Sequence, residues 1–114
     1  MYEYRVEKKV CVVETGGGLT LTEPHRFKAF VLEILENAEY EGLIVNFKNL
    51  QFIDSFGIGV IVALLKASKE KKRPFAITEM SDNHKLLFSS VGLDKAIDIY
   101  NSDDDAITAM TAKS

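Results

Sequence analysis

The stretch of this sequence most able to carry chemistry is Phe-Ile-Asp-Ser-Phe-Gly-Ile-Gly-Val at residues 52–60. Asp54 and Ser55 stand where a loop leads into an apolar segment of helical spacing, which also contains Gly57 and Gly59. The free N–H groups and positive dipole end of a helix N-terminus favour an anion. Either Asp54 or Ser55 can cap this helix, and a phosphate carried on Ser55 would be stabilised there. The two glycines leave room for another chain to approach the first turns.

Two interpretations of Ser55 stay open at this point: a site of regulatory phosphorylation, and an ordinary helix cap. Asp54 is equally ambiguous, because a carboxylate here can cap the helix, position the serine hydroxyl, or help to bind the metal–nucleotide of an incoming kinase.

Other polar residues do not support catalysis or metal binding. Glycines 16–18 lack a following Gly-Lys-Ser/Thr, so we expect a flexible turn and not a nucleotide-binding loop. His25 and His84 have no further ligands at suitable spacing, and we expect both on the surface near helix starts. The acids 103–105 suit the start of a helix and not a metal site. Because no spacing assembles a serine, a base and an orienting acid, we predict that the protein is not an enzyme and uses no cofactor.

The surrounding pattern predicts an α/β fold. We expect a mixed, mostly parallel sheet of about five strands, with an antiparallel N-terminal hairpin at its edge and about four helices packed on it. Period-two and β-branched runs predict strands, and apolar residues at three- and four-residue spacing predict helices. The expected strands are 2–7, 9–14, 42–47, 74–78 and 96–100, with 42–47 central; the expected helices are 23–37, 56–71, 83–90 and 103–112, and residues 48–54 are expected to form a loop.

Length and composition limit the function classes. The 114 residues fit a single domain spanning residues 1–114. A net charge of −3 and a pI near 5.4 argue against direct nucleic acid binding. We expect the basic run 69–73 to be the solvated end of a helix. Cys11 lies among valines, so we expect a buried thiol in a reducing cytosol. No apolar run approaches the ~20 residues of a membrane span, and residues 1–9 have no apolar signal core, so we expect a cytoplasmic protein without membrane insertion.

Two segments with a fixed separation make the sequence resemble the STAS family. The first is the helix-start motif formed by Asp54, Ser55, Gly57, Ile58 and Gly59. The second comprises residues 85–88, 91–93 and 97–100, which resemble the closing helix, the Gly-Leu turn and the final strand of that family. The resemblance extends from Val10 to Ala109.

The resemblance implies an anti-sigma factor antagonist, a phosphorylation-controlled protein that switches partners. The unmodified form would bind a kinase-like anti-sigma factor and free its sigma factor. The anti-sigma factor serine kinase would then phosphorylate Ser55 and end the binding, and a PP2C-type phosphatase would restore it. Phosphate adds nearly two negative charges to a surface that must otherwise contact the partner closely. Electrostatic repulsion at the serine can therefore end the binding without any refolding of the protein.

The face expected to bind the partner combines three segments. Its predicted members are Thr20, Leu21, Thr22, Asp54, Ser55, Phe56, Gly57, Ile58, Met80 and Ser81. The sequence departs from the family pattern at two points. Phe56 follows the serine where a small residue is usual, and can be an anchor for the partner or an obstacle to the kinase. Thr20 stands where the family often has an acid near the phosphorylated serine.

Two other functions remain in competition with this one. A STAS subunit supporting an ABC-type or other membrane transport assembly would use the same fold, and a small hydrolase or nucleotide-binding enzyme would show turnover or stabilisation by nucleotide. The oligomeric state, monomer or homodimer, stays open.

Overall fold

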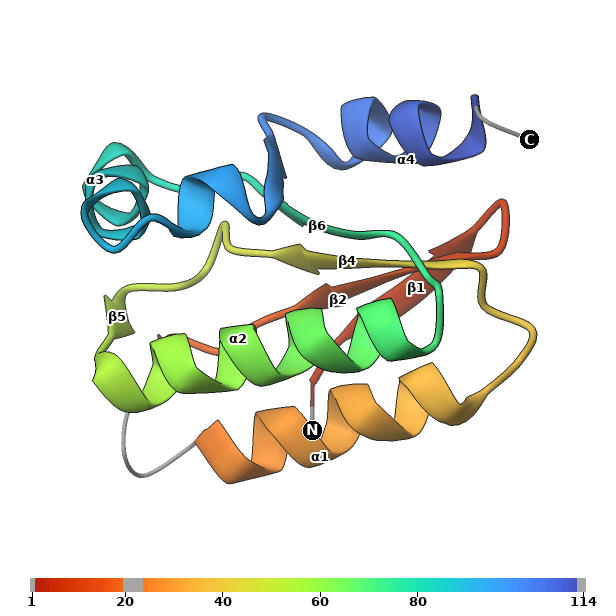
Figure 1. Cartoon of the computed structure of the whole chain (residues 1–114), viewed down its shortest axis with the longest axis horizontal. Helices are drawn as coiled ribbons and strands as arrows, with labels where there is room; N and C mark the ends of the chain where they lie inside the picture. Colours follow the sequence, from red (N-terminus) through yellow and green to blue (C-terminus); the bar gives the residue numbers. More distant parts are fainter. Residues whose placement is uncertain (1, 20–23, 113–114) are drawn as a thin grey trace.

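A five-stranded mixed sheet forms the centre of the protein. The computed structural model describes residues 2–19 and 24–112 (Figure 1). The order of strands across the sheet is β1-β2-β4-β6-β7, with β1 antiparallel to β2 and the remaining neighbours parallel. Their bounds are β1 Tyr4–Glu7, β2 Val10–Glu14, β4 Gly42–Asn46, β6 Phe75–Thr78 and β7 Asp98–Tyr100. The predicted α/β class, the edge hairpin and the central strand are confirmed.

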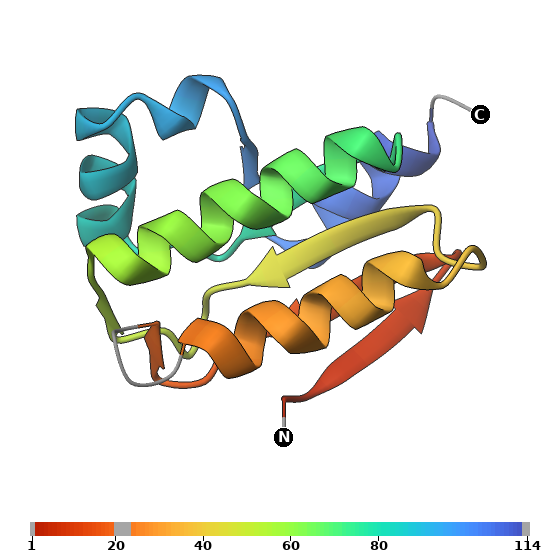
Figure 2. The ribbon, with the colours of Figure 1, turned by 60° about the horizontal axis from the view of Figure 1, so that its bottom comes forward.

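Helices cover both faces of this sheet. Helices α1 (Pro24–Glu36) and α2 (Ser55–Glu70) lie side by side on one face, and α4 (Asp103–Thr111) packs on β4, β6 and β7 from the other (Figures 1 and 2). Helix α3 (Asp82–Ser90) lies at one end of the molecule. The described residues thus contain the four expected helices.

The apolar pattern explains this layering. All five residues of β4 are buried, as expected for a strand covered on both faces. On β2, Cys11 and Val13 belong to the core beneath α1 and α2, whereas Val10 and Val12 belong to the core beneath α4. The alternation of side chains along a strand therefore feeds two separate hydrophobic layers. Cys11 is fully buried, as predicted.

The β1–β2 hairpin closes through a two-residue turn at Lys8 and Lys9, at the boundary between the two expected strands. Their φ angles are +50° and +66°, the two positive values of the turn type that matches the twist of paired strands. The hairpin thereby leaves β1 at the outer edge of the sheet, beside α1 (Figure 2).

Three short elements were not predicted. Residues Gly18–Leu19 (β3) and Phe52–Ile53 (β5) form a parallel two-stranded pair, although residues 48–54 were expected to form a loop. Leu93–Lys95 forms a single 3-10 turn, and β7 begins at Asp98 where a strand from residue 96 was expected. Strands of two residues are too short to display a period of two, so only tertiary packing reveals them.

Asp103 has a larger structural role than its predicted place at a helix start. Ser102 caps α4 by accepting a hydrogen bond from the Asp105 N–H at 3.1 Å, while the Asp103 side chain is buried. It accepts hydrogen bonds from Asn46 Nδ2 at 3.0 Å and from the Thr78 hydroxyl, and pairs with Arg5 at 3.2 Å. One carboxylate thus ties α4 to β4, β6 and β1.

The surface position expected for His84 is wrong. Its side chain is 8% exposed and packs edge-on against Phe47, with ring centres 6.2 Å apart. His84 precedes Phe88 by one helical turn, so both residues lie on the buried face of α3.

Candidate functional site

Asp54 caps the N-terminus of α2. Its backbone is extended, and Asp54 Oδ1 accepts hydrogen bonds from the N–H groups of Phe56 and Gly57, both at 3.0 Å. These are two of the four N–H groups that a helix start leaves without helical partners. The structure therefore resolves the choice between Asp54 and Ser55: the cap is the aspartate.

Ser55 is the first residue of α2, and it is exposed. No side-chain hydrogen bond joins its hydroxyl to any residue in the described parts of the chain. Ser55 therefore neither caps the helix nor packs in the core, and its side chain is accessible from solvent.

Gly57 is required by a close approach within the chain itself. A Cβ atom added at this position would lie 2.0 Å from the carbonyl oxygen of Leu19 and 2.8 Å from Ile53. That carbonyl also accepts a hydrogen bond from the Asp54 N–H at 3.3 Å. The β3–β5 pair thus runs against the first turn of α2 and fixes the cap beside Ser55.

Gly59 has no such explanation. It is exposed, and nothing lies within 4 Å of an added Cβ atom. Ser55, Gly59, Val62 and Lys66 follow one another at four-, three- and four-residue spacing, and all four are exposed. This α2 stripe is a continuous strip of one helix face that starts at the serine.

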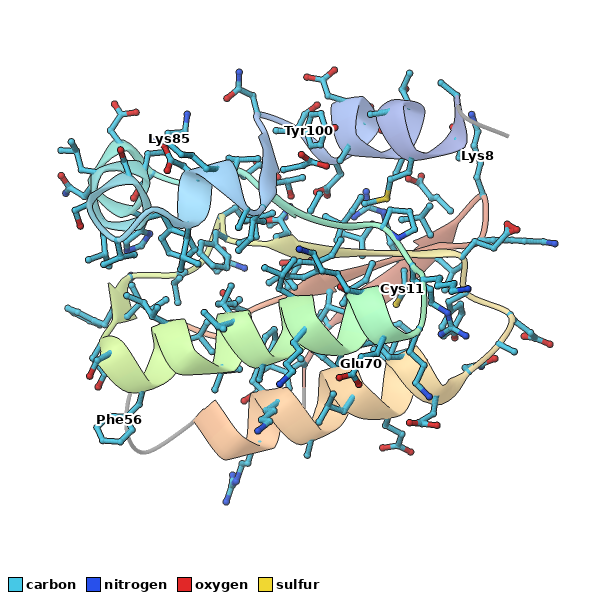
Figure 3. The ribbon with its side chains drawn as sticks, in the orientation of Figure 1. Lys8, Cys11, Phe56, Glu70, Lys85 and Tyr100 are labelled. Atoms are coloured by element: carbon cyan, nitrogen blue, oxygen red, sulfur yellow. The ribbon has the colours of Figure 1, made fainter. Side chains whose placement is uncertain are left out.

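Two exposed aromatic residues flank Ser55 in the sequence. Phe56 is 56% exposed, and its ring extends away from the body of the protein at the start of α2 (Figure 3). Phe52, in β5, is 67% exposed. Phe52 was not among the predicted site residues, because a two-residue strand offers no alternation from which its exposure can be inferred. Exposed aromatics are common anchors in protein interfaces.

The remaining predicted site residues differ in accessibility. Thr20, Leu21 and Thr22 lie outside the described residues. Met80 is 6% exposed and belongs to the main core, so its side chain offers a partner almost no surface. Ser81 is exposed but caps α3, accepting a hydrogen bond from the His84 N–H at 3.2 Å. Ile58 is half-buried.

Neither metal-binding groups nor membrane spans are found in the described ranges. No cluster of three His, Cys, Asp or Glu side chains there could hold a metal ion, and none of the helices there is long and apolar enough to cross a bilayer. The site consists of a capped helix start, an exposed hydroxyl and exposed aromatic side chains, which is the composition of a binding surface.

The fold is α/β, with a mixed sheet and a capped helix, α2, that follows the short strand β5. The chain belongs to the STAS domain family, whose sequence pattern matches residues 1–106. Among curated relatives, the anti-sigma F factor antagonist of Paenibacillus polymyxa is 27% identical over 108 residues, which cover 95% of this chain and 92% of that protein.

Solved structures agree on the fold. A Thermotoga maritima protein provisionally described as an anti-sigma factor antagonist has a TM-score of 0.88 at 24% identity, covering 96% of this chain and 93% of that one. The unphosphorylated form of the Bacillus anti-sigma factor antagonist SpoIIAA has a TM-score of 0.82 at 18% identity over 98% and 97% of the chains. A sulfate transporter family protein from Wolinella succinogenes has a TM-score of 0.81 at 16% identity over 95% and 89%.

Proposed function

We propose that this chain is an anti-sigma factor antagonist controlled at Ser55 and acting in the cytoplasm. In its unmodified state, the surface at the start of α2 binds a kinase-like anti-sigma factor, which then releases its sigma factor. The same partner phosphorylates Ser55 and so ends the binding, and a PP2C-type phosphatase reverses the modification. The observation that carries the proposal is the exposed Ser55 hydroxyl at a helix start that Asp54 already caps.

The α2 stripe supports docking at this place. A glycine inside a helix lowers stability by roughly 1 kcal/mol relative to alanine, and nothing in the described residues requires one at position 59. A partner that approaches the helix backbone closely beside Ser55 accounts for this glycine. Phe56 and Phe52 would then lie at the border of the contact and supply its apolar anchors.

Phosphate would oppose this contact by charge and by size. A phosphorylated Ser55 carries nearly two negative charges directly after the Asp54 carboxylate. An interface shaped for the neutral hydroxyl and apolar rings cannot accommodate that group without desolvating it.

The first test is intact-mass analysis with site mapping on the protein purified from its native cells, together with identification of the protein that co-purifies. The proposal expects a phosphate on Ser55 in part of the population, and a kinase-like partner bound only to the unmodified part. An unmodified Ser55 under every growth condition, with a transport ATPase attached, would refute it in favour of a transport-associated role.

Substitutions test the same surface with the purified partner. Ser55→Asp is expected to weaken binding at least about tenfold, and Phe56→Ala by roughly tenfold or more, while far-UV circular dichroism stays unchanged. Thr108→Asp, at an exposed position on α4, is the control matched in charge. Equal loss of binding in Thr108→Asp would show that net charge, and not the Ser55 surface, controls the interaction.

A further inference from the structure

The outer edge of the sheet at β1 is an open strand edge bordered by an acidic, partly apolar groove. All four residues of β1 are exposed, and within the described residues only β2 pairs with it. Tyr4 is 53% exposed and Val6 44%. Open edges of this kind accept an additional strand, because their backbone N–H and C=O groups have no partners.

The register shows which groups face outward. The Glu14 N–H donates to the Glu3 carbonyl at 2.9 Å, so Glu3 and Glu14 form a hydrogen-bonded pair. Such pairs alternate along an antiparallel ladder, and Arg5 is therefore the next β1 residue bonded to β2. The N–H and C=O groups of Tyr4 and Val6, between these positions, point away from β2 toward the open edge.

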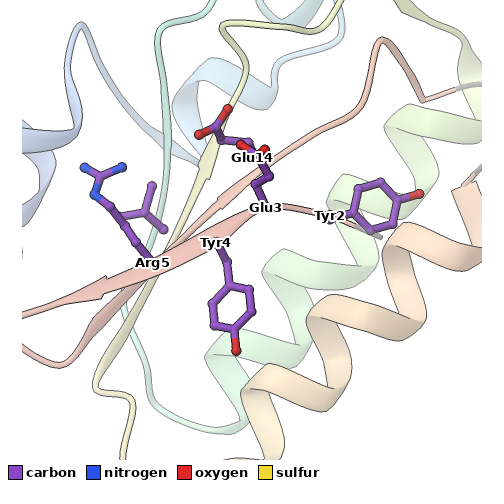
Figure 4. A pocket seen from close by; sticks show the side chains of 6 residues that line it. Tyr2, Glu3, Tyr4, Arg5 and Glu14 are labelled. Carbon is purple, nitrogen blue, oxygen red and sulfur yellow. The ribbon is translucent and has the colours of Figure 1, made fainter.

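The side chains of Tyr4 and Val6 lie on the α1 side of the sheet. Tyr4 packs against Phe30 of α1 with ring centres 5.7 Å apart, and Figure 4 shows its ring directed toward the helices while Arg5 is directed away from them. An added strand would place every second side chain on this same side, next to the exposed parts of Tyr4 and Val6.

Two hollows that share Tyr40 form the groove on that side. One, of about 270 Å³, is lined by Tyr4, Phe30, Glu33, Ile34, Asn37 and Tyr40. The other, of about 410 Å³, is lined by Val6, Lys9, Ala38, Glu39, Tyr40 and Glu41. Three exposed carboxylates and a single ammonium group therefore border an aromatic and aliphatic floor.

We propose that this edge binds an extended segment of a partner protein as an additional antiparallel strand, whose side chains on the α1 side are apolar at the centre and lysine or arginine at both ends. The central apolar side chains pack on the floor formed by Tyr4, Val6 and Tyr40. The basic side chains at the two ends lie on the same side of the strand, one facing the carboxylate of Glu33 and the other those of Glu39 and Glu41. Backbone pairing with Tyr4 and Val6 supplies affinity, and the acidic border selects the charge of the partner.

A second copy of this chain fits the edge less well. Self-pairing that uses all four outward groups would place Tyr4 opposite Val6 of the other copy, Arg5 opposite Arg5, and Glu3 opposite Glu7. Like charges directly opposite one another destabilise an antiparallel pair. The charges of the edge thus favour a basic strand over a copy of β1.

The probe is the synthetic peptide Lys-Thr-Val-Thr-Val-Thr-Lys, in which both valines and both lysines lie on one side of a strand. It is titrated into the isotopically labelled full chain and followed by amide NMR. We expect saturable shifts at the Tyr4 and Val6 amides, and affinity that falls between about 50 and about 200 mM NaCl. The peptide with glutamate in place of each lysine is expected not to bind. Shifts confined to other parts of the chain, or equal binding of the acidic peptide, would overturn the proposal.

Variants separate backbone pairing from charge. Val6→Pro removes an outward N–H without touching the β1–β2 bonds and should weaken peptide binding roughly tenfold, whereas Val6→Thr, which keeps that N–H, should not. Glu39→Lys with Glu41→Lys should weaken it by roughly fivefold or more. Glu70→Lys with Asp94→Lys, which changes the charge equally outside the groove, should leave it unchanged.

Two further outcomes would decide against the proposal. Ser55→Asp is expected to bind the peptide like the wild type, so a loss of binding would place the peptide at the Ser55 surface instead. A chain that sediments as a dimer without peptide, and becomes monomeric on Val6→Pro, would identify a second copy as the occupant of the edge.

Discussion

Alanine substitutions at Gly57 and Gly59 should change stability in opposite directions. Both glycines lie in the first turns of α2, two residues apart, and both gain helix propensity when replaced by alanine. They differ in their surroundings: an added Cβ meets the Leu19 carbonyl oxygen at 2.0 Å at position 57 and open space at position 59. The pair therefore isolates the effect of the close approach between β3 and α2.

The expected magnitudes follow from these distances. At position 57 the backbone of Leu19 must withdraw by about 1 Å to reach even the shortest separation that real Cβ atoms show, 3.0 Å. Leu19 is fully buried and its carbonyl accepts the Asp54 N–H, so withdrawal disturbs both packing and a hydrogen bond. We expect Gly57→Ala to lower the free energy of unfolding by about 1–3 kcal/mol after its propensity gain, and Gly59→Ala to raise it by about 0.5–1 kcal/mol.

Urea denaturation followed by far-UV circular dichroism measures both variants against the wild type. The difference between the two free energies of unfolding should be about 1.5–4 kcal/mol, at unchanged dependence on urea concentration. If Gly57→Ala proves as stable as Gly59→Ala, then β3 does not lie against the helix start, and the geometry described for the Asp54 cap is mistaken.

Three further predictions concern other parts of the structure. Asp54→Ala should lower the free energy of unfolding by about 1 kcal/mol through loss of the cap, and Asp54→Asn by much less, measured by urea denaturation. Asp103→Ala should lower it by roughly 2–4 kcal/mol in the same measurement, because the buried Thr78 hydroxyl loses its acceptor and Asn46 Nδ2 keeps only its hydrogen bond to Glu79, while exposed Asp104→Ala should change little. Burial raises the pKa of the Cys11 thiol from 9.0 to about 11, so its protonated form is favoured in the folded state and stability should fall between these pH values by up to about 1.4 kcal/mol per pH unit. Denaturation at several pH values tests this. The decrease in the free energy of unfolding per pH unit should be smaller in Cys11→Ala by the contribution of the thiol.

Periodicity was sufficient to predict the sheet and its helices, because each long element buries one face or both. Residues 42–46 form a buried central strand as their unbroken apolar run indicates, and α2 starts within one residue of its predicted position. The same reasoning could not choose between Asp54 and Ser55 as the cap, since both residue types cap helices and only the backbone geometry at Asp54 decides.

Some of the errors originate in tertiary contacts, whereas another had a local signal in the sequence. Nothing local distinguishes the buried Asp103 from its exposed neighbour Asp104; the difference arises from Asn46, Thr78 and Arg5, far away in the sequence. Burial of His84 could have been inferred from its spacing to Phe88, which puts both on one helix face. No spacing in the sequence indicates that Phe52 is exposed.

The cap at α2 also determines which groups could neutralise a phosphate on Ser55. Helix starts usually neutralise an anion with their free N–H groups, but Asp54 Oδ1 already occupies those of Phe56 and Gly57. The phosphate would then add its charge to that of a neighbouring carboxylate that already holds these donors. The negative charge would therefore face away from the chain, and its neutralisation would depend on groups of a second protein.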